Sequence, residues 1–310
     1  MGIAFLFPGQ GSQIPGMLHA LPSHPAVHQT LDEVSQVLGK HVLDLDSSVA
    51  LQGTVSVQLA LLSAGVATAR ALMAEGVEPE AVAGLSVGSF AAAVQSGAIK
   101  LSDAVRLVQH RAAMMVKLYP DGYGLSTIIG LTEQQVAQLV HDAYTEEFPV
   151  YVGNINAPRQ IVVAGSDTGM TRVMEAARKA GARKVERLKV SVPSHCPLLE
   201  PVAVSLKKMM RTITIQQPTK LYVGNITGRV LRTSDAIAED LAGNIAHGVR
   251  WLDSTTVLEE LGCHLFIEMP PGHVLRELAR ESQVGVRTLS VGESALPYVL
   301  RIALERVGEE

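Results

Sequence analysis

A serine flanked by glycines marks the first place where this sequence could do covalent chemistry. Gly84-Leu85-Ser86-Val87-Gly88 fits the pattern G-x-S-x-G, between an apolar run at 81–85 that predicts a buried strand and a small-residue run at 87–96 that predicts a helix. Glycines allow the tight turn that exposes a serine hydroxyl at a helix N-terminus, where the Val87 N–H can face a developing oxyanion. The pattern predicts a nucleophilic Ser86, and a strand–helix turn without chemistry is the alternative.

A serine nucleophile needs a base, and His195 stands out among the ten histidines. It lies between Pro193 and Pro197, in an irregular segment of the kind that positions side chains instead of filling a core. Cys196 beside it offers a rival Cys–His pair, but adjacent residues usually point apart, and cysteine is commonly a small buried hydrophobe. We therefore predict that His195 is the base, with a surface or capping histidine as the alternative.

Arg111 lies where a helix would bury its charge. A helix is expected at 102–118, and the residues three and four positions before and after Arg111 are all apolar, namely Leu107, Val108, Met114 and Met115. A buried guanidinium needs an anion or several acceptors. The two interpretations are an internal salt bridge to an Asp or Glu, and a fixed cation that binds a substrate carboxylate through two hydrogen bonds.

A glycine-rich loop at 7–13 follows the first apolar run, which predicts a strand at 3–7. The spacing of its glycines is not that of a dinucleotide-binding fingerprint, and the sequence contains no P-loop pattern. Loops at the carboxyl ends of strands are nevertheless where α/β proteins place their active sites. The backbone N–H of Gln10 is therefore a candidate second donor to an oxyanion.

Two groups of elements must position these residues. Residues 122–190 predict the order strand, helix, strand, strand, helix, strand of a ferredoxin-like unit, whose first helix is opened by the capping box Thr132-x-x-Gln135. Residues 1–121 and 191–310 alternate between expected strands and helices, which predicts a largely parallel sheet. The sequence thus predicts an α/β fold, with a large catalytic domain at 1–121 and 191–310 and an inserted small domain at 122–190.

Composition excludes several classes of protein. Of 310 residues, 47% are apolar and 18% are charged, which is a globular composition with enough apolar material for a core. The formal net charge of −4 argues against a nucleic-acid-binding protein. Two cysteines cannot form a disulfide framework or a four-cysteine zinc site, so we expect no metal and a reducing, cytoplasmic location. The uncharged stretches 47–69 and 81–99 are rich in small polar residues, so we expect buried segments of a soluble fold and no membrane span.

A basic run at 178–189 contrasts with the acidic net charge, because it holds six basic residues and one acid. Lys207, Lys208 and Arg211 could extend it into a basic face. Such a run is usually a solvated face, and docking of an acidic partner or of a CoA phosphate is the alternative.

Six motifs in this order resemble the malonyl-CoA:acyl-carrier-protein transacylase family over essentially the whole chain. The resemblance implies a large α/β-hydrolase-like domain with a parallel sheet and an inserted ferredoxin-like small domain. The motifs are Phe7-Pro8-Gly9-Gln10-Gly11-Ser12-Gln13, Gly84-x-Ser86-x-Gly88, Arg111, Asn154-x-Asn156-x-Pro158, Pro193-Ser194-His195 and Glu268-x-x-Pro271-Gly272-x-Val274-Leu275.

The resemblance also implies roles for the residues around Ser86. It implies a Ser86–His195 dyad in which a backbone carbonyl, at the position of Arg250, orients the histidine in place of a carboxylate. The N–H groups of Gln10 and Val87 would form the oxyanion hole.

The substrate side of the site follows from the same resemblance. Arg111 would hold the free carboxylate of a malonyl group, and Asn154, Asn156 and Val274 would line the pocket. The reaction implied needs no cofactor. On this resemblance, malonyl-CoA would be the substrate, and the partner would be an acyl carrier protein whose phosphopantetheine-type thiol accepts the malonyl group.

Two residues beside Ser86 depart from the family, which usually has His before the nucleophile and Glu three positions after it. Here these positions hold Leu85 and Ser89, and the usual Gly-Pro-Gly near the end is Pro270-Pro271-Gly272. These segments are similar to the acyltransferase (epsilon) subunit of malonate decarboxylase, which charges that enzyme's own carrier protein. We therefore expect malonyl transfer to the malonate decarboxylase carrier. The alternatives are a malonyl-CoA:acyl-carrier-protein transacylase of fatty-acid synthesis, a serine thioesterase or hydrolase, and a non-catalytic carrier-docking subunit.

Overall fold

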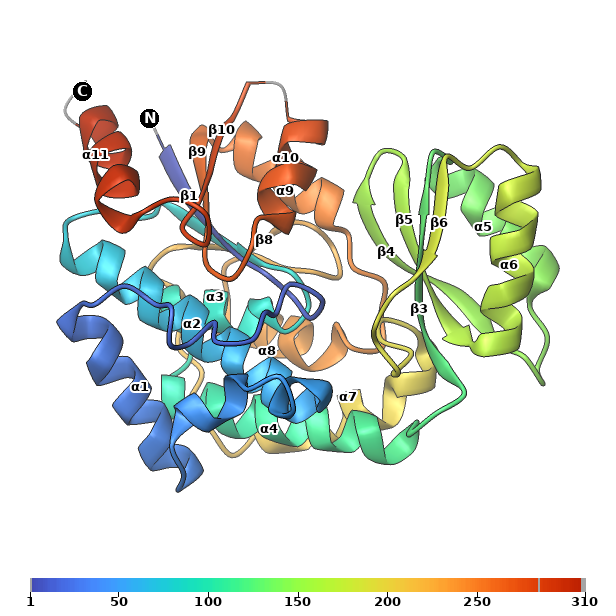
Figure 1. Ribbon diagram of the computed structural model, residues 1–310, viewed down its shortest axis with the longest axis horizontal. Helices are drawn as coiled ribbons and strands as arrows, with labels where there is room; N and C mark the ends of the chain where they lie inside the picture. The colour runs from blue at the N-terminus through green and yellow to red at the C-terminus, as the bar shows by residue number, and fades with distance from the viewer. Residues whose placement is uncertain (1, 284, 308–310) are drawn as a thin grey trace.

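The computed structural model describes residues 2–283 and 285–307, and these contain two separate sheets. The larger sheet has the strand order β10-β9-β1-β2-β7-β8, in which every pairing is parallel except that of the edge strand β8 with β7. Figure 1 shows this sheet inside the larger part of the molecule, with helices around it. Its strands are β1 (Gly2–Phe7), β2 (Ala81–Gly84), β7 (Leu221–Val223), β8 (Val230–Leu231), β9 (Cys263–Glu268) and β10 (Arg287–Ser290).

Helices cover both faces of the larger sheet. They are α1 (Pro25–Leu38), α2 (Thr54–Ala74), α3 (Gly88–Gln95), α4 (Leu101–Leu118), α7 (Glu200–Met210), α8 (Ser234–Gly243), α9 (Trp251–Glu260), α10 (Val274–Ser282) and α11 (Leu296–Val307), with short 3₁₀ segments η1 (Val42–Asp46), η2 (Ala50–Gln52) and η3 (Pro197–Leu199). Alternate side chains of β1 enter different cores, because Ile3, Phe5 and Phe7 pack with α2, α3 and α4, whereas Ala4 and Leu6 pack with α9 and α10. A strand buried on both faces has a continuous apolar sequence, as 3–7 does.

The helix α2 is long and apolar enough to cross a membrane by length and composition alone. In the fold, 83% of its most apolar window is buried, and it contributes residues such as Leu59 and Leu62 to the largest core. The expectation that 47–69 and 81–99 contain buried segments is confirmed, since α2, β2 and α3 are almost entirely buried.

The smaller sheet is antiparallel and has the order β4-β5-β3-β6. Its elements are β3 (Tyr123–Ile129), α5 (Glu133–Ala143), β4 (Val150–Ala157), β5 (Gln160–Ser166), α6 (Asp167–Lys179) and β6 (Lys184–Arg187), and this is the expected ferredoxin-like succession. The expected capping box at Thr132 and Gln135 opens α5. Both helices pack on one face of this sheet around Ile128 and Ile161, as the right side of Figure 1 shows. These two helices do not cover the opposite face of the small sheet.

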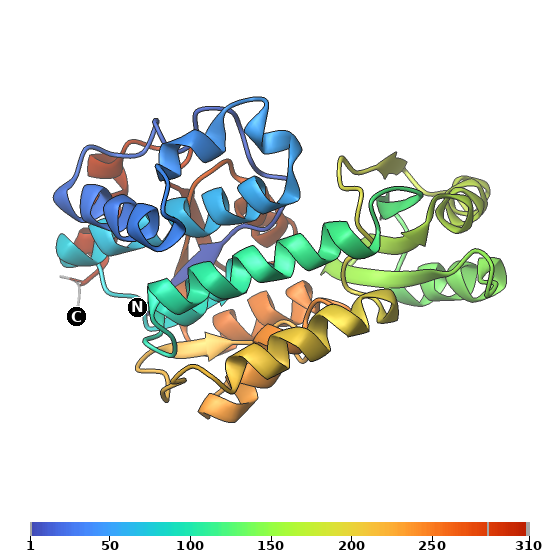
Figure 2. The same cartoon turned by 90° about the horizontal axis from the view of Figure 1, so that it is seen from below.

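The chain enters and leaves the small sheet beside two long helices. Figure 2 shows that α4 and α7 run side by side from the larger domain toward the smaller one. Tyr119, at the end of α4, donates a hydrogen bond to the carbonyl of Leu198 at 3.1 Å. This hydrogen bond therefore links the two chain segments that connect the larger domain to the smaller one.

The structure also contains elements that the sequence pattern did not predict. They are α1, α9, α10, β8 and β10, together with the 3₁₀ segments η1 and η2. Strand β6 ends at Arg187, three residues before the end of the ferredoxin-like unit expected at 122–190. The expected division at 122–190 stays a prediction, although all strands of the smaller sheet lie between Tyr123 and Arg187.

Candidate active site

The turn between β2 and α3 holds Ser86 in the left-handed region of backbone space, at a φ of 56°. Glycines make this turn possible. A Cβ on Gly84 would lie 2.1 Å from the backbone of Gly88, and a Cβ on Gly88 would lie 2.2 Å from the carbonyl oxygen of Phe7. This turn, residues 84–88, is called the elbow. It is packed tightly against the end of β1, and it exposes Ser86 at the N-terminal end of α3.

His195 meets the hydroxyl of Ser86 from a separate loop. Its Nε2 lies 2.8 Å from Ser86 Oγ, and its side chain is buried. His195 also has a positive φ, 68°, and its backbone N–H donates to the carbonyl of Ile245 at 2.7 Å. Two strained backbone positions thus face each other, which is typical of an active site whose surroundings hold the strain.

The other ring nitrogen of His195 identifies its orienting partner as Asn244. Nδ1 lies 2.6 Å from the backbone carbonyl oxygen of Asn244. The expectation that Arg250 supplies this carbonyl is wrong, because the carbonyl of Arg250 accepts the N–H of Ser254 in the first turn of α9. The Asn244 carbonyl follows the last residue of α8, where a helix leaves its carbonyls without partners. A carbonyl can only accept, so Nδ1 carries the proton and Nε2 is free to accept the proton of Ser86.

The surroundings keep His195 neutral. Burial and the nearby charge of Arg111 lower the pKa of His195 to about 3, although the hydrogen bonds to the backbone of Asn244 and His247 oppose this shift. A neutral imidazole is the form that can act as a base.

Arg111 is buried, with 1% of its surface exposed, as its position on α4 predicts. Its guanidinium donates to Gln58 Oε1 at 2.6 Å and to Ser86 Oγ at 3.0 Å, and its Nε has no partner among the residues that the structure describes. No carboxylate within residues 2–283 and 285–307 forms a salt bridge with Arg111, so the alternative of an internal salt bridge is not realised. Burial lowers the pKa of Arg111 to about 9, so the group remains a cation at neutral pH.

Two polar side chains that the sequence did not single out complete this arrangement. Gln58 comes from α2 and links Arg111 to Gln10, to which its amide lies at 3.3 Å. Asn225 follows β7 and brackets the elbow, since its side chain accepts from Ser86 N at 2.8 Å and donates to Gly84 O at 2.7 Å. A long amide side chain in a helix of apolar and small residues is the one sequence signal for Gln58. Asn225 had no comparable signal.

Two backbone N–H groups near Ser86 are available to a ligand. The amides of Gln10 and Val87 donate to no other group within the described part of the chain. Val87 is the residue before the first turn of α3, where the helix dipole favours negative charge. Gln10 lies in the loop after β1 and lines a cavity together with Ser86 and His195.

A cavity of about 330 Å³ leads to Ser86 and His195 from between the two sheets. The free face of the small sheet forms one wall, and Val274 of α10 lies at another. Within the described residues, three buried oxygens on the small-sheet wall have no hydrogen-bond partner, namely those of Thr127, Asn154 and Asn156. The expected pocket residues Asn154, Asn156 and Val274 thus line one cavity with the dyad.

Cys196 is a buried thiol and does not face this cavity. Its Sγ lies 3.2 Å from the carbonyl of Pro193, and burial raises its pKa to about 12. A thiol of this kind is inert. The choice of Ser86 over Cys196 as nucleophile is therefore favoured by the geometry.

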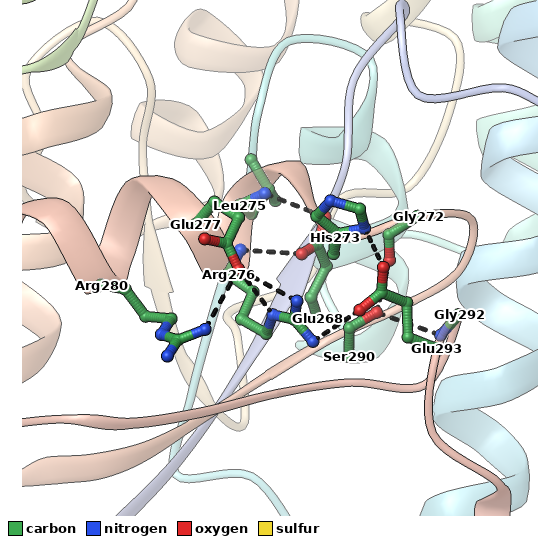
Figure 3. A network of polar contacts seen from close by, with 10 residues as sticks. All are labelled: Glu268, Gly272, His273, Leu275, Arg276, Glu277, Arg280, Ser290, Gly292 and Glu293. Atoms are coloured by element: carbon green, nitrogen blue, oxygen red, sulfur yellow. Dashed lines mark hydrogen bonds and ion pairs between the residues drawn. The ribbon is translucent and has the colours of Figure 1, made fainter.

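A polar network fixes the first turn of α10 at the cavity wall. The buried carboxylate of Glu268 accepts the backbone N–H groups of Leu275 at 3.0 Å and Arg276 at 2.7 Å (Figure 3). Glu293 pairs with Arg276 at 2.8 Å and with His273, and so fastens the neighbouring loop to the same turn. An acceptor at a helix N-terminus satisfies amides that the helix leaves free, and here it also sets the position of Val274.

Comparison with known proteins places the chain in a family. The family model described as "Acyl transferase domain" matches residues 4–293. The malonyl CoA-acyl carrier protein transacylase of Escherichia coli strain K12 is 36% identical over 97% of this chain and 98% of that protein, and that of Bacillus subtilis is 31% identical over 99% and 98%. The chain belongs to the malonyl-CoA:acyl-carrier-protein transacylase family.

Solved structures agree with this membership. The acyl-carrier-protein S-malonyltransferase of Burkholderia pseudomallei superposes with a TM-score of 0.92 at 34% identity, over 97% of this chain and all of that chain. A malonyl-transacylase in complex with a type II polyketide synthase acyl-carrier protein superposes with a TM-score of 0.92 at 33% identity, over 99% of this chain and all of that chain. The large α/β domain with a parallel sheet and a small domain is therefore shared, and this member of the family is an acyltransferase.

Two of the residues in which this transacylase-family chain departs from the usual pattern, Leu85 and Ser89, lie near the dyad. Leu85 lines the cavity. Ser89 is fully buried in the first turn of α3, and its hydroxyl donates to the carbonyl of Ser86 at 2.6 Å. Neither residue replaces a member of the dyad.

The basic run at 178–189 does not form one uninterrupted face. Lys184 pairs with Glu186 at 2.5 Å, and Arg187 pairs with Asp167 at 2.5 Å. Lys184 also lies at the wall of the cavity. Within the described residues, no group of three or more His, Cys, Asp or Glu side chains is placed to hold a metal ion.

Proposed function

We propose that this chain transfers a malonyl group from malonyl-CoA to the thiol of an acyl carrier protein through an ester on Ser86. The observation that carries the proposal is the buried cation of Arg111, which donates to the hydroxyl of Ser86 and has no carboxylate partner among the described residues. A substrate with a free carboxylate two bonds from its thioester carbonyl supplies the missing anion beside the nucleophile.

The first half-reaction forms the malonyl ester. Nε2 of His195 takes the Ser86 proton as Oγ attacks the thioester carbonyl, and the amides of Gln10 and Val87 hold the oxyanion. The tetrahedral intermediate then expels the CoA sulfur, which takes the proton from the imidazolium. The carbonyl of Asn244 stabilises the transient charge on His195 through Nδ1.

The second half-reaction returns the enzyme to its starting state. The carrier thiol gives its proton to His195 and attacks the ester carbonyl, and the same two amides hold the second oxyanion. Collapse of this intermediate breaks the bond to Ser86 Oγ, which regains its proton. The products are a malonyl thioester on the carrier and the free hydroxyl of Ser86.

A serine hydrolase fits the geometry less well. Hydrolases of the α/β class orient the histidine with an Asp or Glu side chain, whereas the partner of His195 is a backbone carbonyl. A generic esterase also has no use for a buried arginine at the nucleophile. A non-catalytic docking subunit does not require the dyad, which is intact here.

The acceptor is an acyl carrier protein in this proposal, because the relatives that match over nearly the whole chain are named for that carrier. Leu85 and Ser89 favour a second acceptor, the carrier subunit of malonate decarboxylase, on the similarity of the motif alone. The chemistry at Ser86 is the same for both carriers. The two carriers would therefore be distinguished by how their surfaces bind this protein.

Transfer assays with defined carriers test the proposal. Malonyl-CoA would be incubated with the protein alone, with a fatty-acid-type holo acyl carrier protein, and with the malonate decarboxylase carrier bearing its phosphoribosyl-dephospho-CoA arm. We expect malonyl-carrier by mass spectrometry with at least one carrier, and little CoA release without one. Steady CoA release that no carrier accelerates would identify a thioesterase instead.

A further inference from the structure

We propose that Ser89 and the side chain of Asn244 are positioning residues that hold Ser86 and His195 at reacting distance. This inference rests on the roles proposed above for Ser86 as nucleophile and His195 as base. It adds a hydrogen-bonded link between the two that passes behind the dyad and does not touch the substrate.

The link closes a ring of hydrogen bonds. Ser89 Oγ donates to the backbone carbonyl of Ser86 at 2.6 Å, and Asn244 Nδ2 donates to Ser89 Oγ at 3.1 Å. The backbone carbonyl of the same Asn244 accepts from His195 Nδ1 at 2.6 Å. His195 Nε2 then returns to Ser86 Oγ at 2.8 Å. The ring thus joins the elbow, the loop of His195 and the end of α8.

The side chain of Asn244 enters this ring through its amide nitrogen alone, while its backbone N–H donates to the carbonyl of Asp240 at 2.8 Å. The residue is fully buried, and its Oδ1 has no hydrogen-bond partner in the described part of the chain. The bond from Nδ2 to Ser89 is therefore the one polar contact that fixes its side chain among the described residues. Because its carbonyl lies beyond the last residue of α8, the direction of that carbonyl depends on how the residue is held.

Ser89 is a suitable connector because a hydroxyl can accept and donate at once. It accepts from Asn244 and donates to Ser86, and its side chain is fully buried. The family usually carries Glu at this position. A neutral connector beside the dyad is thus a feature of this chain.

A hydroxyl bonded to a backbone carbonyl three residues earlier is also common without any link to a site. Ser96, just after the last residue of α3, shows this form, since its buried Oγ donates to the carbonyl of Ala93 at 2.9 Å. Ser96 and Ser89 therefore match in burial and in the bond to a carbonyl three residues earlier, whereas Ser89 also contacts the side chains of Asn244 and Tyr222. Ser96→Ala is the matched control for Ser89→Ala.

The test measures how fast Ser86 reacts with phenylmethylsulfonyl fluoride, a neutral reagent that needs the dyad but neither a carboxylate nor a carrier. Intact mass would follow a single adduct on the full-length protein, with Ser86→Ala as the blank. We expect Ser89→Ala and Asn244→Ala each to react about ten- to a hundredfold more slowly, the range that a misplaced reacting group causes. Ser96→Ala should react at the unaltered rate.

Two further results separate positioning from general stability. The double variant Ser89→Ala/Asn244→Ala should react no more slowly than the slower single variant, because both changes open the same ring. In the transfer assay, Ser89→Ala should lower kcat and leave KM for malonyl-CoA unchanged, since Ser89 touches no substrate.

The outcomes that overturn the inference are distinct from failure of the proposed function. Failure of the unaltered protein to form an adduct at Ser86 would refute the nucleophile and the function with it. An adduct formed equally fast by Ser89→Ala and the unaltered protein would refute the ring alone. The ring would also be refuted if Ser89→Ala, Asn244→Ala and Ser96→Ala all formed the adduct more slowly, each in proportion to its loss of thermal stability.

Discussion

Arg111 distinguishes this site from that of a generic serine esterase. Its charge is buried at the nucleophile, and two of its donors already bond Gln58 and Ser86, so a carboxylate that enters finds a preoriented cation. The same charge lowers the pKa of His195. Binding of a substrate carboxylate to Arg111 would partly neutralise that charge, and so would strengthen the base when a substrate of the right kind is present.

Replacing Arg111 by Ala should reduce the preference for malonyl-CoA over acetyl-CoA by about ten- to a hundredfold, the range expected for hydrogen bonds to a charged group. The preference is measured as the ratio of kcat/KM values for formation of the acyl-enzyme. Arg106→Ala is the control, because Arg106 lies on the exposed side of the same helix and pairs with Asp103. An unchanged ratio in Arg111→Ala would show that Arg111 does not bind the carboxylate.

Burial of neutral His195 should make stability depend on pH. The pKa of His195 is about 3 in the folded protein, below the ordinary value of 6.5, so the unfolded chain binds more protons between these values. Acidification through that window therefore favours unfolding. From pH 7 to pH 5, the free energy of unfolding of the unaltered protein should fall by about 2 kcal/mol relative to that of His195→Gln. Urea unfolding at the two pH values measures this difference, and equal falls in both proteins would contradict the low pKa.

At the scale of elements, the strand–turn–helix of Ser86 and the helix of Arg111 follow from local sequence. The glycines around Ser86 predict the elbow, and the apolar spacing around Arg111 predicts the buried face of its helix. Both predictions use only residues close together in the sequence. The carbonyl that meets His195 does not follow in this way, since it depends on where α8 ends and how that end lies against a distant loop. For this reason the sequence pattern does not point to Asn244, and the family resemblance points to Arg250 instead. Gln58 and Asn225 do not stand out in the sequence because they act through contacts between residues far apart in the chain.

The elbow predicts a sharp effect of one methyl group. Gly88→Ala would bring a Cβ to 2.2 Å from the carbonyl oxygen of Phe7, so the elbow must move away from β1 or the protein must unfold. We expect the free energy of unfolding to fall by about 1–3 kcal/mol or more, since about 1–3 kcal/mol is the usual range for overpacking. We also expect the variant to form no acyl-enzyme. Gly53→Ala is the control, because a Cβ there has its nearest neighbour at 3.5 Å and the φ of −94° suits any residue. A stable and active Gly88→Ala variant would contradict the description of the elbow.

At the scale of the whole molecule, the site exists because two differently built domains face each other. The parallel sheet presents the elbow and the loop after β1 at the carboxyl ends of its strands, and the small sheet supplies the opposite wall. The alternation of strands and helices predicts both architectures. It does not predict that Thr127, Asn154 and Asn156, whose oxygens have no partner among the described residues, share a cavity with Ser86, because that depends on how the domains pack. Only the family resemblance predicts Asn154 and Asn156 as pocket residues.

The most direct test of the central claim is the intact mass of the protein seconds after mixing with malonyl-CoA. The account predicts one malonyl adduct per chain, absent in Ser86→Ala and much weaker with acetyl-CoA. The adduct should disappear when a competent carrier is added. No adduct with malonyl-CoA, or an equal adduct in Ser86→Ala, would contradict the claim that Ser86 carries the malonyl group.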